Sequence, residues 1–232
     1  MTDLTQVQAV EPEAGLARSA YDEIRRAIIG GALPEGSLTS VRALSEALGI
    51  SRTPVREALV ELARDGMVSF ERNRGVRICV TRRHDVEEIF DLRLLLEVPA
   101  VLGAVEMIDD SDVAALEDSL SQMRDSMDDE AEFMRYDWSF HRLLLEKTGN
   151  ERLVTFVGRL RDQTRIRGIS TVGRSRQLDA IVAEHQAVLD AAKSRDAQAA
   201  AAAMEIHLKT TRALLLAQED ADQATTETQE ER

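Results

Sequence analysis

Cysteine and aromatic residues are scarce in this chain of 232 residues. Cys79 is its single cysteine, and aromatics make up 3% of the sequence. One cysteine excludes an intrachain disulfide and a CxxC redox or zinc motif, and it fits a reducing cytosol. A core with so few aromatics has to be built from Ala, Leu, Val and Ile, which favours helices packed on helices over a β-sandwich. The composition therefore predicts a mainly α protein.

Long apolar runs and a basic N-terminus are also missing. The longest uninterrupted apolar stretch is the short Ala-rich run that ends at Met204, far below the roughly 18 residues that a membrane span needs. The N-terminus carries Asp3, Glu11 and Glu13 where a signal peptide has basic residues. We expect a soluble, unexported protein that stays in the cytoplasm and has no membrane partner.

Lysine is absent from residues 16–83, and this part of the chain is basic all the same. It contains 12 Arg and 8 acidic residues, a net charge of +4, whereas the chain after residue 83 carries −14 and the whole chain −13. The acidic net charge of the whole chain argues against nucleic-acid binding, but the basic net charge of residues 16–83 allows it. A basic N-terminal module is joined to an acidic C-terminal one.

Helical periodicity and breakers predict two folded modules between two tails. Residues 1–15 and 218–232 lack recurring apolar positions, and we expect both to be disordered. In residues 16–82 the pattern predicts helices at 16–29, 40–48 and 51–66 and a hairpin at 67–80. In residues 83–217 it predicts helices at about 85–107, 111–126, 130–147, 151–168, 174–193 and 196–217. The expected fold is an N-terminal winged helix-turn-helix with a small β-hairpin wing, followed by an all-α six-helix bundle.

The third predicted helix begins with residues suited to DNA. Its first turn carries Ser51, Arg52, Thr53 and Arg56, and the hairpin tip carries Arg74. An arginine offers a bidentate fork to guanine, and hydroxyls and a helix N-terminus can meet phosphates, while the tip would reach the adjacent minor groove. Any one of these arginines could equally be an ordinary solvent-exposed surface residue, but their clustering on one module favours DNA binding.

A specific motif occupies this turn: the run LGISRTPVREAL at residues 48–59, with Leu62, Gly66, Asn73 and Gly75 after it. These residues resemble the winged-helix domain of the GntR family of bacterial transcription regulators. The resemblance implies DNA contacts by Arg42, Arg52, Thr53 and Arg56, and by Gly75 at the wing tip. Ser40 stands where the family commonly has Glu. We expect this departure to weaken a helix cap or a local ion pair and to remove no DNA contact.

Three of the four histidines fall on apolar helical faces in the acidic module. Asp137 and His141 share one face of a predicted helix, and His185 and His207 lie on two others. A single histidine on such a face is most often a core residue. Three of them with an inward Asp favour a metal site, because bundle interiors assemble ligands from facing helices and no cation is evident for Asp137.

The same segments, Asp137 to His141, Glu184-His185 and Met204 to Leu208, resemble the FCD ligand-binding domain of the FadR-type GntR regulators. The resemblance implies a divalent metal held by Asp137, His141, His185 and His207, with further coordination positions open to water or an organic carboxylate. Three imidazoles and one carboxylate suit Zn²⁺, Ni²⁺, Fe²⁺ or Mn²⁺ and do not choose among them.

Arg93 lies on the inward stripe of the first bundle helix, where it needs an anion. Its partner is either Glu97, one helical turn later, or the carboxylate of an effector. Arg161, Arg165 and Arg167 are further effector candidates that a solvated helix face explains equally well. His84, beside the junction of the two modules, is expected at the surface.

Together these patterns favour a homodimeric transcription regulator on a palindromic DNA operator, more often a repressor in this family, and here of a catabolic operon. A small organic acid would modulate it, and no catalysis is expected. Two alternatives stay open. A metal-dependent hydrolase is disfavoured because no general base of the HExxH kind stands beside the ligands. The other is a constitutive DNA-binding protein whose metal only braces the bundle.

Overall fold

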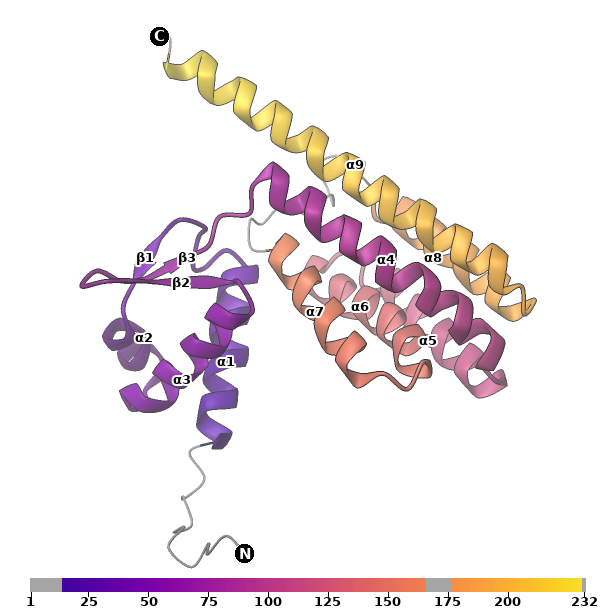
Figure 1. Ribbon diagram of the computed structural model, residues 1–232, viewed down its shortest axis with the longest axis horizontal. Helices are drawn as coiled ribbons and strands as arrows, with labels where there is room; N and C mark the ends of the chain where they lie inside the picture. Colours follow the sequence, from indigo (N-terminus) through magenta and orange to yellow (C-terminus); the bar gives the residue numbers. More distant parts are fainter. Residues whose placement is uncertain (1–13, 166–176, 231–232) are drawn as a thin grey trace, which may run out of the picture. The chain divides into compact units, whose positions relative to one another are not determined.

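The computed structural model describes residues 14–165 and 177–230, with side chains up to residue 218 (Figure 1). The described residues fall into two compact units that meet between Val80 and Thr81, called the first and second unit below. Both are mainly helical, and the expected fold class, a winged helix-turn-helix followed by a helical bundle, is confirmed. Within the described residues, none of the helices is both long and apolar enough to span a membrane.

The first unit packs three helices against a small sheet. Its elements are α1 (Ala14–Ile29), β1 (Leu38–Thr39), α2 (Val41–Leu48), α3 (Arg52–Arg64), β2 (Val68–Glu71) and β3 (Gly75–Ile78). The strands are antiparallel in the order β1-β3-β2, with Leu38 opposite Arg77 and Val68 opposite Ile78. Ile28 of α1 and Leu59 of α3 are fully buried in its core. The predicted hairpin thus forms the wing, and the pairing of β1 with β3 widens it into a sheet.

Two local features of the first unit differ from expectation. The two residues of β1 are too few to show strand periodicity, so the sequence pattern did not predict this strand. The expected weakening of the helix cap at Ser40 is wrong, because Ser40 itself is the N-cap of α2 and its hydroxyl accepts a hydrogen bond of 3.0 Å from the amide of Ala43. Serine is among the best residues at that position.

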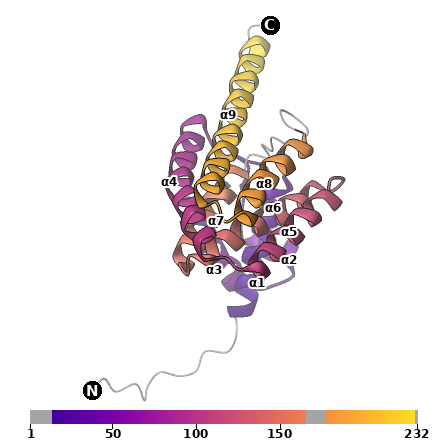
Figure 2. The ribbon, with the colours of Figure 1, turned by 90° about the vertical axis from the view of Figure 1, so that its right-hand side faces the viewer.

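The second unit is a bundle of helices. Its described elements are α4 (Arg83–Met107), α5 (Asp110–Asp125), α6 (Glu130–Lys147), α7 (Glu151–Arg165), α8 (Leu178–Lys193) and α9 (Ala197–Glu230). Helices α4 and α9 lie along each other, α8 packs on α9, and α5 packs on α6 (Figures 1 and 2). Phe90, Phe133 and Phe140 are fully buried in the main core, so a few large side chains anchor a mostly aliphatic interior.

The end of α9 corrects one boundary. We expected the last helix to stop at residue 217 and the tail from 218 to be disordered, yet α9 continues to Glu230. The tail contains Ala, Gln and Glu, which favour helix, and has neither Gly nor Pro to end one. A segment of low hydrophobicity has no apolar face with which to pack against the bundle, but its residues still favour the helical backbone conformation. Of the tail expected at 1–15, residues 14 and 15 begin α1, and residues 1–13 lie outside the described part.

Replacing Gly75 should measurably change the stability of the first unit. Its φ is 123°, and a Cβ at this position would lie 2.2 Å from the main-chain oxygen of Thr39 in β1. Because both the backbone conformation and the close approach exclude a side chain, Gly75→Ala should lower the free energy of unfolding of the first unit by about 1–3 kcal/mol. Chemical denaturation of the full chain, followed by circular dichroism, measures this loss.

The matched control is Gly103→Ala. Gly103 lies within α4 and has nothing within 4 Å of an added Cβ, so this change should leave stability equal or higher. An unaltered unfolding midpoint for Gly75→Ala would contradict the close approach of β1 to the wing.

Candidate functional site

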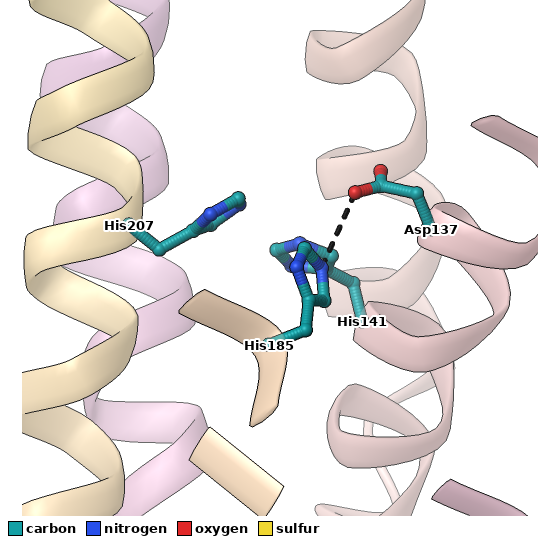
Figure 3. Close-up of side chains that lie close together, drawn as sticks. All are labelled: Asp137, His141, His185 and His207. Carbon is teal, nitrogen blue, oxygen red and sulfur yellow. Dashed lines mark ion pairs between the residues drawn. The ribbon is translucent and has the colours of Figure 1, made fainter. Parts of the chain in front are cut away.

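Four buried polar side chains converge inside the second unit (Figure 3). Asp137 and His141 come from α6, His185 from α8 and His207 from α9. One potential ligand atom of each lies within 4.8 Å of those of the others. The ring of His185 lies 5.2 Å from that of His141 and 4.6 Å from that of His207, between centroids. The structure therefore brings together all four residues that the sequence indicated.

Each imidazole is held through its Nδ1 atom by an acceptor behind the cluster. The acceptors are Oε2 of Glu97 for His141 at 2.7 Å, the main-chain oxygen of Ile181 for His185 at 2.9 Å, and Oε2 of Glu184 for His207 at 2.8 Å. An acceptor at Nδ1 keeps the proton there and leaves Nε2 as the nitrogen with a lone pair. This is the usual arrangement of histidines that bind a metal.

The Nε2 atom of His141 is buried and has no hydrogen-bond partner among the described residues. That of His185 is buried 3.2 Å from Oδ1 of Asp137, and this contact does not form a hydrogen bond. Leaving such a polar atom unsatisfied in an apolar interior costs about 1–3 kcal/mol. A divalent cation coordinated by these nitrogens would remove that cost. The orphaned nitrogens are thus the observation of this structure that fits a metal.

Asp137 uses its two carboxylate oxygens differently. Oδ1 lies 3.2 Å from Nε2 of His185, on the side of the histidines, and Oδ2 pairs with the guanidinium of Arg161 from α7. The expectation that Asp137 lacks a cation is therefore wrong. Arg161 is on another helix, 24 residues away in sequence, where no spacing rule within one helix could find it. With this partner present, the argument for a metal depends on the histidine nitrogens and not on an unpaired carboxylate.

The protonation states at the cluster suit a cation. Burial lowers the pKa of His141 to about 4, and the charge of Arg161 adds to the shift while Glu97 opposes it. Burial would raise the pKa of Asp137, but the charge of Arg161 and the contact with His185 hold it well below its ordinary range. At neutral pH His141 is neutral and Asp137 is ionised, which are the forms that coordinate a divalent ion.

The arginines predicted to contact an effector lie in different surroundings. Arg93 is buried, and its Nε donates to Oε1 of Glu97 at 2.6 Å, so the structural partner considered for it is present. Its Nη2 is buried without a hydrogen-bond partner in the described part of the chain. Arg161 is buried at Asp137, and Arg165 is half-buried in the last turn of α7. Arg167 lies outside the described residues.

Glu97 and Glu184 are the site residues that sequence reasoning missed in this role. Glu97 was considered only as a partner of Arg93, and Glu184 only as part of the Glu-His pair. Both carboxylates lie beside metal-ligand candidates, yet each contacts the Nδ1 side of a ring, away from Nε2. They orient the imidazoles from the side opposite Nε2.

The residues predicted to contact DNA are exposed on the first unit. Ser51 is the N-cap residue of α3, and Arg52, Thr53 and Arg56 are exposed on its first turns. Elsewhere on this unit, Arg42 of α2 is exposed and pairs with Glu46 at 2.7 Å, and Arg74 is exposed in the wing turn at 3.3 Å from Glu71. Gly75 is half-buried against Thr39, which gives it a structural role independent of DNA.

Comparisons with known proteins match both parts of the chain. Residues 16–78 match the bacterial regulatory proteins of the gntR family, and residues 88–210 match the FCD domain. The HTH-type transcriptional regulator YdhC of Bacillus subtilis is 25% identical over 183 residues, 78% of this chain and 82% of that protein. The HTH-type transcriptional repressor NanR of Klebsiella aerogenes is 30% identical over 217 residues, 84% of this chain and 83% of that protein.

Among solved structures, E. coli McbR/YncC has a TM-score of 0.78 and 21% sequence identity, and the match covers 90% of this chain and 99% of that one. At this identity the likeness shows a shared fold.

The histidine cluster makes a testable prediction. Protein purified without chelator should carry about one divalent ion per chain, and His185→Ala should lose most of it, because three donors without the central imidazole bind more weakly. Chelation should lower the melting temperature, because it leaves the orphaned nitrogens buried. Elemental analysis by mass spectrometry and thermal unfolding measure the two effects.

His84→Ala is the matched control, since the His84 side chain is 77% exposed and pairs with Glu88 on the surface of α4. It should change neither metal content nor melting temperature. Substoichiometric metal in the unchelated wild type would make the three buried histidines ordinary core residues.

Proposed function

Because this chain belongs to the GntR family of bacterial regulatory proteins and carries an FCD domain, we propose that it is a transcription regulator controlled by a small organic acid. In this proposal a divalent metal is held by Asp137, His141, His185 and His207, and a carboxylate of the acid binds beside it. The orphaned Nε2 atoms in the interior of the second unit are the observation that carries the proposal. The protein would act in the bacterial cytoplasm, where its operator lies.

The first unit supports DNA binding by its geometry. A helix N-terminus with two exposed arginines and two hydroxyls combines bidentate donors for guanine with donors for phosphate. The buried residues Pro54 and Val55 hold the opposite face of α3 in the core. In the proposal α3 therefore enters the major groove with its first turn facing the bases, and Arg42 and Arg74 contact the flanking backbone.

Two buried arginines support an acid as the effector. Arg93 and Arg161 lie close enough that the charge of Arg161 lowers the pKa of Arg93, an effect that burial reinforces as the larger cause. Each already has one carboxylate partner, while Nη2 of Arg93 has no hydrogen-bond partner among the described residues. A metal ion supplies a Lewis acid for one carboxylate oxygen when it is bound. The guanidinium of Arg93 would receive a second anionic or polar group of the same molecule.

The alternatives fit this geometry less well. The relatives YdhC and NanR are named as HTH-type transcription regulators. The carboxylates of Glu97 and Glu184 contact the far side of the imidazoles, so hydrolysis lacks a base. A purely structural metal would account for the histidines but leaves Nη2 of Arg93 unused. Repression is the mode we propose, in line with the repressor named among the relatives.

A dimer on a palindromic operator is part of the proposal. On α4, Leu92 and Leu95 are 40% and 71% exposed, and Pro99 and Leu102 continue the same stripe at heptad spacing. Exposed apolar stripes of this kind mark interaction surfaces, and a two-fold axis across one would pair it with itself. Two symmetric winged helices then require a two-fold operator.

The arginines of α3 should decide operator affinity. Arg52→Ala, and separately Arg56→Ala, should weaken specific operator binding by about 1–3 kcal/mol if each makes a bidentate base contact, with no change in unfolding. Arg64→Ala is the control, because Arg64 is exposed at the opposite end of the same helix. Fluorescence anisotropy at fixed salt measures the affinities, and equal binding by all four proteins would remove α3 from the interface.

The experiment that tests the function is a titration of the metal-loaded chain with short mono- and dicarboxylic acids. The correct acid at about 100 times its dissociation constant should stabilise the protein by about 2.7 kcal/mol, raise the melting temperature and change operator affinity. An acid that alters stability without altering operator affinity would support the structural-metal alternative. Turnover of the acid would support the hydrolase, and Arg93→Met should abolish the response.

A further inference from the structure

Helix α7 contributes no residue to the main hydrophobic core in the described part of the second unit. The main core draws residues from α4, α5, α6, α8 and α9 and none from α7. Val157 of α7 belongs instead to a separate small cluster with Ala100 and Leu145. Elements with few buried apolar contacts shift at a lower free-energy cost than core helices. Polar contacts therefore have an unusually large share in fixing the position of α7.

One of these polar contacts faces the candidate metal centre. Arg161, in the last turns of α7, pairs with Oδ2 of Asp137 and lies over the ring of Trp138, with 5.3 Å from Cζ to the ring centroid. A cation or an acid at the centre acts on the same carboxylate and the same guanidinium. Occupancy of the centre must change the electrostatic environment of Arg161 and, through it, the end of α7.

A second polar contact joins the end of α7 to the start of the second unit. The hydroxyl of Thr81 donates a hydrogen bond of 2.8 Å to the main-chain oxygen of Gln163, two residues after Arg161. Thr81 is 5% exposed, follows directly on Val80, where the first unit ends, and precedes the first turn of α4. The side chain of Thr81 thus joins the chain that leaves the first unit to α7.

We propose that the last turn of α7 couples the Asp137 centre to the junction between the two units, and that the Thr81 hydroxyl is the coupling contact. Arg161 and Gln163 belong to the same helical turn, so a displacement of one moves the other. The inference rests on the proposed function, since it names the route by which the occupied centre would reach the first unit. Coupling requires that the Thr81 contact differ between the occupied and unoccupied states.

Hydrogen exchange of the full chain tests the route with the metal alone. Peptides covering residues 79–86 are compared between chelator-treated protein and the same protein reloaded with Zn²⁺, in the wild type and in Thr81→Val and Thr81→Ser. Zn²⁺ should change exchange in this segment by at least about 5-fold in the wild type and in Thr81→Ser, the lower end of typical coupling. Thr81→Val, which keeps the shape and loses the hydroxyl, should show no such change.

Thr164→Val is the matched control. Thr164 is similarly buried in the same turn, but its hydroxyl donates to the main-chain oxygen of Arg161 within α7. It should keep both the wild-type response and the wild-type Zn²⁺ affinity in calorimetry, whereas Thr81→Val should change the Zn²⁺ affinity by about the factor lost in exchange, because coupling is reciprocal. A full Zn²⁺ response in Thr81→Val, or none in the wild type, would overturn the proposal.

Operator binding of the same samples separates this inference from the proposed function. An acid response at the operator without any change at residues 79–86 leaves the function standing and rejects the route. A Zn²⁺ response at residues 79–86 that Thr81→Val abolishes, without any effect of metal or acid on operator affinity, supports the route and rejects the proposed function.

Discussion

The carboxylate of Asp137 lies between the guanidinium of Arg161 and the imidazole of His185, in a helical interior that is otherwise largely apolar. An ionised carboxylate in such a place is stable only when its charge is compensated and its oxygens are bonded. Arg161 meets one oxygen and leaves the other directed to the histidines. The arrangement of α6, α7 and α8 around this group follows from that requirement, because each helix supplies one of the partners.

The carboxylates of Glu97 and Glu184, which contact Nδ1 of His141 and His207, are buried or half-buried groups that likewise need compensated charge and bonded oxygens. Glu97 bridges Arg93 and His141 with its two oxygens, so one carboxylate compensates a buried cation and sets the orientation of an imidazole. Buried networks of this kind often contribute little to stability when compared with apolar residues of similar volume. Their value lies in geometry, because they hold the three rings and Asp137 with one potential ligand atom of each within 4.8 Å of the others.

In the first unit, main-chain packing positions the exposed residues. Gly75 allows β3 to pass close to Thr39, which ties β1 to the wing. The unit has a core of its own, from Ile28 of α1 to Ile78 of β3. Its surface arginines therefore do not depend on the polar network of the second unit for their placement.

Features that depend on neighbours along the chain could be predicted from the amino-acid pattern. The helix order, the start of α3 at Ser51 or Thr53, Glu97 as one of two candidate partners of Arg93 and the Asp137–His141 face follow from spacings of a few residues. The four candidate metal ligands could be selected because each lies on an apolar stripe. Four contacts became visible only in the three-dimensional structure: Arg161 with Asp137, Glu184 with His207, Thr81 with Gln163, and β1 with β3 in the sheet. Those partners come from different helices or strands, and periodicity indicates which face of an element is buried but not which residue of another element it meets.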